Sequence, residues 1–235
     1  MKAGAKRFYT QVDTKAVANG FAVLLDGKAI KTPAGQVQTA PTKALAEAIA
    51  QEWREQAEEI DIHSLVLTKA LNTSLDRVAS HREDIIEELA NYAGCDLLCY
   101  RAEAPAELVR RQSLHWDRWL DWAAKKFGIS LTVVSGLNHA QQPSKTLATI
   151  KSALAAHDTF ELTALHTGVT ITGSAVLGLA FTVGAISADE AFEISQIDET
   201  FQAERWGRDA EAEVARSRRL EDLRTARRYL DLLLP

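Results

Sequence analysis

The stretch LTALHTGVTITGSAVLGLAFTVGAISA, residues 162–188, decides how the C-terminal part of this chain folds. It carries no Asp, Glu, Lys or Arg over 27 residues, which is long enough to cross a bilayer. Four glycines and five threonines interrupt it, and the positive and aromatic flanks of a membrane anchor are missing. Gly173-Ser174 near its middle predicts a break. We therefore expect two helices buried on most sides and no stable membrane insertion, with a membrane contact as the alternative.

The sequence on both sides of this stretch predicts helices from residue 65 onward. Apolar residues at helical spacing form one stripe, with Ser80 as the cap of the next helix and Gly94 as its end. A helix at about 106–127 is expected to stop at Gly128. Ser187 begins a capping box ahead of the last helical segment. The stripe comprises Leu67, Leu71, Leu75 and Val78.

The first forty residues have the alternating pattern of strands instead. Runs at Phe8–Val12 and Phe21–Leu25 are followed by Asp26-Gly27, a strong hairpin signal because its turn requires positive φ. After Pro41, a helix capped by Thr42 is expected to cover one face of this sheet. The segment 60–62 is interpreted as a return to the sheet.

These patterns together predict an α+β fold. A small β-rich N-terminal domain with a covering helix, residues 1–64, precedes an α-helical C-terminal bundle, residues 65–235. The composition, 46% hydrophobic and 25% charged, is that of a globular protein. A net charge of −5 argues against nucleic acid as a partner, because phosphate binding needs a positive field.

The chain lacks the short sequence motifs that indicate catalysis or phosphate binding. We find no G-x-S-x-G, G-x-x-x-x-G-K-[ST], G-x-G-x-x-G or H-E-x-x-H. Cys95 and Cys99 lie one helical turn apart, but a metal site needs two further ligands and nothing nearby repeats the pattern. The sequence thus predicts neither a metal nor a cofactor.

Two places in the N-terminal half break the helix-packing pattern. Gln56 falls on the same apolar side of its helix as Trp53, where an unpartnered amide costs about 1–3 kcal/mol. An anchor to the sheet and a binding role both explain it. Asn72 and Asp76 belong to a polar run in the middle of a helix, which is unfavourable by propensity. A network at a domain junction or a partner surface would compensate.

The third such place is the segment 197–207. Asp198 projects near the inward face of its helix, where a carboxylate needs a partner. Arg205 falls at nearly the same angle, so Asp198 pairs with Arg205 or another cation, or it awaits a partner from outside. Glu199 and Trp206 point to the more exposed side.

The three places, in this order and spacing, resemble one family. The segments E-W-x-x-Q (52–56), N-T-S-L-D (72–76) and acidic-Q-x-x-W-G (198–207) are similar to those of the assembly chaperone of the alpha subunit of F-type ATP synthase. The resemblance implies a non-enzymatic protein that holds free alpha subunit until it pairs with beta, without nucleotide or metal. It also implies a β-rich domain joined to a helical one.

The resemblance also assigns a set of residues to partner binding. An acidic residue of the last motif is essential in the family. Its counterpart here is Asp198, where other members carry glutamate, or else the neighbouring Glu199. An acidic chaperone could cover basic groups that a lone alpha subunit exposes. The implied set is Asp198, Glu199, Gln202, Glu204, Trp206, Trp53, Gln56, Asn72 and Asp76.

An enzyme is the alternative function. Asp198 or Glu199 would act as a general base in a pocket between the domains, with Trp206 as its wall. The missing transit peptide predicts either the bacterial cytoplasm or, for a trimmed eukaryotic homologue, the mitochondrial matrix, and the Met1-Lys2 start favours the bacterial location.

Overall fold

The computed structural model describes residues 5–136 and 141–234 and forms two compact units. Unit 1 comprises the chain up to His81 together with the residues from Arg228 onward, and unit 2 comprises Arg82–Arg227. The expected α+β fold, with a small sheet near the N-terminus and helices after it, is confirmed. The units divide after His81, whereas the sequence suggested a division after residue 64. The helical segment 66–78 belongs to unit 1 because its hydrogen bonds go to that unit.

The sheet of unit 1 is antiparallel and has β2 at its centre. Its strands are β1 (Val12–Val17), β2 (Gly20–Leu25), β3 (Lys28–Ala29) and β4 (Thr39–Ala40). β2 pairs with each of the other three. The predicted hairpin turn is confirmed, since Asp26 and Gly27 have φ of 46° and 77°. Both values lie in the region that such a turn requires.

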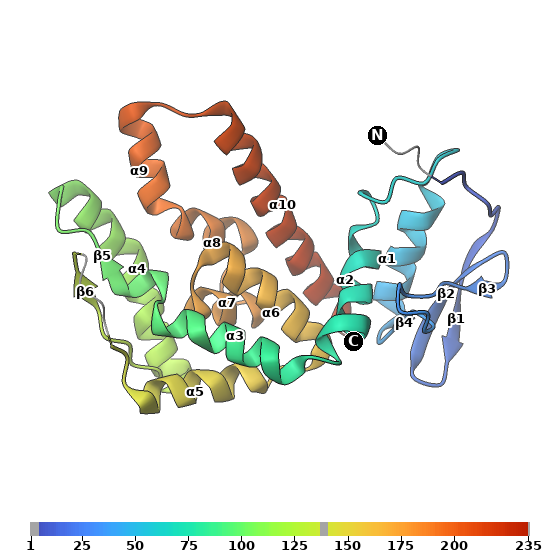
Figure 1. Ribbon diagram of the computed structural model, residues 1–235, viewed down its shortest axis with the longest axis horizontal. Coiled ribbons are helices and arrows are strands. Elements are labelled where there is room, and N and C mark those ends of the chain that lie inside the picture. The colour runs from blue at the N-terminus through green and yellow to red at the C-terminus, as the bar shows by residue number, and fades with distance from the viewer. Residues whose placement is uncertain (1–4, 137–140, 235) are drawn as a thin grey trace. The chain divides into compact units, whose positions relative to one another are not determined.

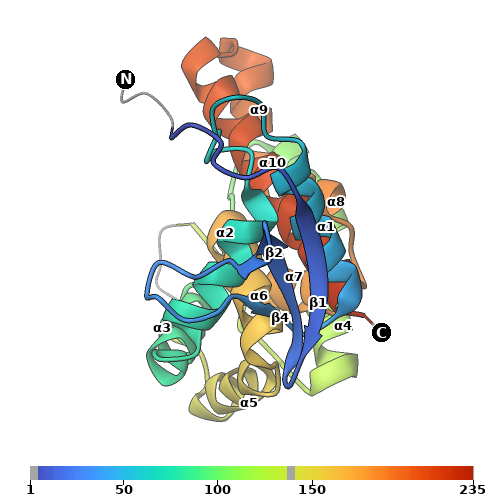
Figure 2. The same cartoon turned by 90° about the vertical axis from the view of Figure 1, so that its right-hand side faces the viewer.

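Helix α1 (Lys43–Arg54) packs across this sheet, against β1 and β2 (Figure 2). Thr42 caps it as predicted, because its hydroxyl accepts from the backbone N–H of Leu45. Leu45 and Ile49 of this helix are completely buried. The covering helix therefore supplies the apolar layer that a small sheet cannot provide for itself.

Two of the predicted strand segments are wrong. The strand expected at 8–12 begins only at Val12, because the carboxylate of Asp26 accepts the backbone N–H groups of Thr10 and Gln11 in place of a strand partner. The segment 60–62 does not return to the sheet, and Ile62 is 64% exposed. There the side chain of Gln56 accepts the N–H of Asp61 and turns the chain away.

The segment after α2 (Val66–Thr73) is a π-helical turn, η1 (Ser74–Val78), which changes the register of the buried stripe. Ser74 is fully buried and Leu75 only partly, so the prediction of Leu75 as a core position is wrong. The Ser74 hydroxyl lies 2.8 Å from that of Tyr229. The end of the last helix is thus part of unit 1.

Unit 2 is helical, with one short pair of parallel strands, β5 and β6, that the sequence did not suggest (Figure 1). Its elements are α3 (Arg82–Gly94), η2 (Leu97–Cys99), β5 (Tyr100–Arg101), α4 (Ala106–Phe127), β6 (Val134–Ser135), α5 (Ser144–Ala155), α6 (Thr159–Thr172), α7 (Ala175–Thr182), α8 (Ala188–Ser195), α9 (Ile197–Trp206) and the part of α10 (Ala210–Leu233) up to Arg227. α4 has the predicted limits, and Gly128 ends it with φ of 71°.

The uncharged stretch forms α6 and α7, with the predicted break between them. Gly173 ends α6 with φ of 67°, and Ser174 caps α7 by accepting the N–H of Leu177. Every residue of α7 is buried. The two helices approach so closely that a Cβ atom on Gly178 would lie 2.3 Å from a methyl of Val169. None of the helices in the described residues is long and apolar enough to span a membrane.

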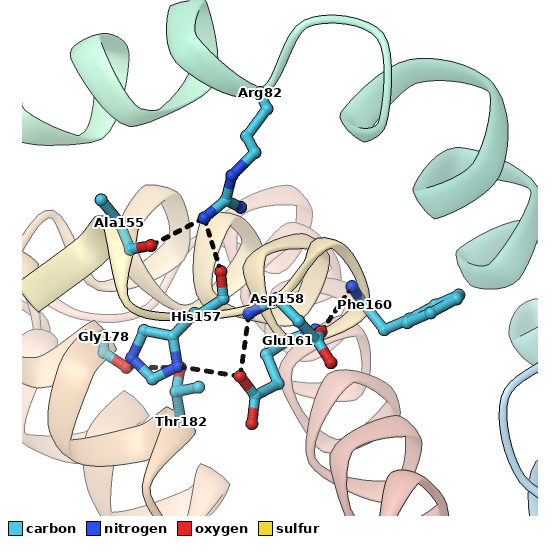
Figure 3. Close-up of polar contacts among 8 residues, drawn as sticks. All are labelled: Arg82, Ala155, His157, Asp158, Phe160, Glu161, Gly178 and Thr182. Atoms are coloured by element: carbon cyan, nitrogen blue, oxygen red, sulfur yellow. Dashed lines mark hydrogen bonds and ion pairs between the residues drawn. The ribbon is translucent and has the colours of Figure 1, made fainter.

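Side chains hold the ends of several helices in unit 2. Arg82 donates to the carbonyls of Ala155 and His157, where α5 gives way to α6 (Figure 3). Asp158 and Glu161 then form a capping box at the start of α6. Ser80 is not the cap of α3 as predicted, because its hydroxyl donates to carbonyls of the preceding turn.

A buried carboxyl, that of Asp96, joins η2 to α7. It accepts the backbone N–H groups of Leu98 and Val176, at 3.0 and 3.2 Å. Burial raises the pKa of this carboxyl to about 6, although hydrogen bonds from Ser174 and these amides oppose the shift. The carboxyl thus satisfies orphan amides at the start of α7 inside the core.

Candidate partner-binding site

The E-W-x-x-Q segment at the end of α1 joins this helix to the start of α2. Glu52 is buried, and its carboxylate accepts the N–H groups of Leu67 and Thr68 at 2.6 and 2.9 Å. These are orphan donors of the first turn of α2, so Glu52 caps that helix from a neighbouring one. The indole N–H of Trp53 donates to the hydroxyl of Thr68 at 3.2 Å.

Gln56 completes this junction within unit 1. Its amide oxygen accepts the N–H of Asp61 at 2.7 Å. Its amide nitrogen donates to the carbonyl of Glu52 and the hydroxyl of Ser64, both at 2.9 Å. Both ends of this buried amide are engaged by α1 and the segment 61–64, so Gln56 is a local anchor and not the anchor to the sheet that the sequence suggested.

The N-T-S-L-D segment is engaged in a similar way, with the loop that precedes β4. Asp76 accepts the N–H of Ala34 and the amide of Gln36, at 2.9 and 2.8 Å. The hydrogen bond from Gln36 is the largest of the effects that lower the pKa of Asp76. Asn72 accepts from the amide of Gln38 at 2.8 Å. The compensating network thus lies inside unit 1.

Asp198, on α9, is held by a neutral partner from α4. Its Oδ1 accepts from the amide nitrogen of Gln112 at 2.7 Å. Gln112 is 1% exposed, and its amide oxygen accepts the N–H of Ala102 at 2.8 Å. The suggested internal pair of Asp198 with Arg205 is wrong, because the guanidinium of Arg205 lies 3.6 Å from Glu107 instead.

An ionic cluster fastens the rest of the same α9 face to α4. Arg111 lies 2.7 Å from both Glu107 and Glu204, and these hydrogen bonds raise its pKa. Arg111 and Arg205 also stack on the ring of Phe201, with guanidinium carbons 5.3 and 4.3 Å from the ring centre. Glu204, a predicted partner-binding residue, is therefore occupied within unit 2.

The adjacent face of α9 is open to solvent. Glu199, Gln202 and Trp206 recur at positions i, i+3 and i+7, which places them on one stripe of a helix. All three are exposed, Trp206 by 78%. Over residues 5–136 and 141–234, no side-chain hydrogen bond or ion pair involves them. Figure 1 shows α9 followed by α10 after a connection that contains no helix or strand.

An open hollow of about 390 Å³ lies between α4 and the segment α8–α9. Its lining includes Arg111, His115 and Glu193, while Asp198 and Glu199 lie outside it. Within the part of the chain that the structure describes, no three His, Cys, Asp or Glu side chains gather in a metal-binding group.

Sequence reasoning missed several residues that position these segments. Gln112 carries a detectable signal, since it lies four residues before the buried Trp116 on the inward stripe of α4. Like Gln56, it is a polar residue on an apolar stripe. Glu52 belongs to a quoted motif, but its capping role depends on a helix that begins fourteen residues later. Glu107 and Arg111 have no signal beyond ordinary surface charge.

The sequence profile of the ATP12 chaperone protein family matches residues 6–124. The chain belongs to the ATP12 chaperone family. The crystal structure of Atp12 from Paracoccus denitrificans is 42% identical, with a TM-score of 0.95 over 98% of this chain and 99% of that one. An aspartate-to-lysine mutant of the same protein matches with the same identity and TM-score, over 98% of each chain.

A more distant relative of this ATP12-family member is the mitochondrial protein atp12 of Schizosaccharomyces pombe. It is 23% identical over 214 residues, which cover 86% of this chain and 74% of that protein. The family resemblance stated from the three motifs is thus confirmed, and the protein is a chaperone of ATP synthase assembly.

Proposed function

We propose that this ATP12-family chaperone binds the free alpha subunit of F-type ATP synthase through α9 and promotes assembly of the catalytic head. The observation that carries the proposal is the stripe of Glu199, Gln202 and Trp206, which is exposed and makes no polar contact among the described residues. A large aromatic residue at the end of a helix, with a carboxylate beside it, is typical of a protein-binding surface.

The residues of the proposed site have two different roles. Glu199, Gln202 and Trp206 are available to a partner, whereas Asp198 and Glu204 are hydrogen-bonded to α4 and hold the helix. Trp53, Gln56, Asn72 and Asp76, which the resemblance also assigned to the partner, support the fold of unit 1 in our proposal. Their effect on binding would then be indirect.

The test is direct binding of the purified alpha subunit of the same organism. We expect the wild-type chaperone to form a complex on size-exclusion chromatography, and Asp198→Lys to lose it. Glu211→Lys, the same charge change at an exposed position of α10, is the matched control and should retain the complex. Intact complex formation by Asp198→Lys would show that α9 is not the binding site.

We further propose that the protein acts without catalysis. Asp96, the carboxyl whose pKa is raised to about 6, is sealed in the core against backbone amides and is not open to a substrate. Asp198, the candidate base, is bonded to a glutamine amide and does not line the neighbouring hollow. The expected location is the bacterial cytoplasm, or the mitochondrial matrix for a trimmed eukaryotic chain.

A further inference from the structure

We infer that α9 separates two tasks: Asp198 positions the helix as a neutral acceptor would, and the charge that the partner reads is that of Glu199, next to Trp206. This inference rests on the proposed function and specifies its contact residues. It assigns the partner contact to Glu199 instead of Asp198, because the two side chains lie on different faces of the helix. It also states what kind of surface the partner presents.

The face of α9 that bears Asp198 already contacts α4. Gln112 donates to Asp198 from a buried position, and the backbone N–H of Ala102 fixes the other end of that glutamine. Phe201, which lies on the same helix, is 4% exposed. Asp198 is partly exposed, so it differs from Glu199 in that its Oδ1 is already engaged by Gln112. The interaction needs an acceptor oxygen at residue 198, and an uncharged amide oxygen provides one.

The face that bears Glu199 is free along its whole length. At 100° per residue, Gln202 and Trp206 lie within about 60° of Glu199 around the helix. The carboxylate, the amide and the indole therefore form a continuous strip two turns long. Gly207 ends the helix directly after Trp206, with φ of 92°, and no atom within 4 Å of its missing Cβ position. Trp206, the last residue of the helix, is 78% exposed.

The charge around this strip identifies its occupant. Residues 198–208 include three acidic side chains and two basic ones. Both basic residues, Arg205 and Arg208, already pair with glutamates of this chain. The complementary surface is a protein patch with an apolar socket for the indole and a guanidinium or ammonium group beside it. We assign this patch to the alpha subunit.

The experiment measures the affinity of immobilised alpha subunit for the chaperone by biolayer interferometry at two salt concentrations. Trp206→Ala is expected to weaken binding at least about tenfold, as loss of an aromatic anchor does. Glu199→Gln should weaken it about threefold and reduce its salt dependence, because one ion pair is lost. Phe8→Ala, at a 72% exposed aromatic of unit 1, and Glu211→Gln are the matched controls and should bind within about twofold of wild type.

Substitutions of Asp198 distinguish a role in positioning α9 from direct contact with the partner. Asp198→Asn keeps an oxygen for Gln112, so it should bind much better than Asp198→Leu, which removes that oxygen. Hydrogen exchange of the α9 amides should speed up in Asp198→Leu and stay unchanged in Glu199→Gln and Trp206→Ala. Asp198→Lys does not separate the two roles, because an ammonium group would also repel the donor amide of Gln112.

Two outcomes overturn the inference, and they are distinguishable from failure of the proposed function. If Asp198→Asn binds as poorly as Asp198→Leu while its α9 amides stay protected, the charge of Asp198 itself contacts the partner. If Glu199→Gln and Trp206→Ala bind like wild type, the strip is not the contact surface. In both cases wild type still binds the alpha subunit. Absence of wild-type binding would refute the proposed function, and this inference with it.

Discussion

The polar residues of α1 and α2 in unit 1 and those of α9 in unit 2 differ in where their hydrogen bonds go. The side chains of Glu52, Gln56 and Asp76 form hydrogen bonds with groups of their own unit. Glu52 and Gln56 are also buried. On α9, the side chains that face α4 also bond within their own unit, whereas Glu199 and Trp206 face solvent. Residues that stand out equally in a sequence thus divide into those that hold the fold and those left over for a partner.

The largest effect on stability is expected from Glu52→Ala in unit 1. The substitution leaves two N–H groups at the start of α2 and the hydroxyl of Thr68 without their acceptor. Loss of a buried cap and its hydrogen bonds should lower the free energy of unfolding by about 3 kcal/mol, measured by urea denaturation.

Glu55→Ala is the control for this change, since Glu55 is exposed directly after the same helix and its side chain bonds only to Gln51 among the described residues. It should stay within about 0.5 kcal/mol of wild type. Equal effects of the two substitutions would contradict the capping role of Glu52.

The corresponding buried acid of unit 2, Asp96, should make stability depend on pH. Because burial raises its pKa to about 6, the folded state binds this proton more tightly than the unfolded state, whose carboxyl titrates near pH 4. Its contribution is therefore fully present below about pH 4 and is lost as pH rises to about 6, a change of about 2–3 kcal/mol.

Asp96→Asn should be less stable at every pH, because its NH₂ group meets backbone donors, and it should lack this dependence. Urea unfolding of both proteins between pH 4 and 7 checks the expectation. Parallel curves for the two proteins would show that Asp96 does not titrate in this range.

A smaller effect is expected from Gln112→Leu on α4, the helix that contacts the Asp198 face of α9. It removes the donor to Asp198 and leaves the N–H of Ala102 unpaired. The free energy of unfolding should fall by about 1–2 kcal/mol, and exchange of the α9 amides should speed up more than that of α7. If amide exchange speeds up equally in α9 and α7, Gln112 stabilises the core in general and does not specifically position α9.

The contrast between unit 1 and α9 also explains which features could be predicted from the sequence. The limits of α4 and the break at Gly173 depend on local signals, a stop glycine and a capping serine, and both were predicted correctly. The partner of Asp198 lies 86 residues away, and helical periodicity suggested Arg205, seven residues along the same helix.

The buried position at 74 was missed for a related reason. A π-helical turn inserts a change of register that a repeat of 3.6 residues does not contain. The two-residue strands β5 and β6 are too short to show any period. Fold class and family were therefore accessible from the sequence, whereas the side-chain pairings that separate structural from partner-facing residues depend on long-range packing.

The smallest effect on stability should come from the residue on which binding depends most. Trp206 is 78% exposed, so Trp206→Ala removes little buried surface and should change the free energy of unfolding by less than about 0.5 kcal/mol. Trp53→Phe in unit 1 is the matched comparison. It loses the indole hydrogen bond to Thr68 and should cost about 1 kcal/mol. Urea denaturation measures both. A large loss for Trp206→Ala would mean that the indole packs on its own chain, and the contrast between unit 1 and α9 would then fail at the position where it matters most for function.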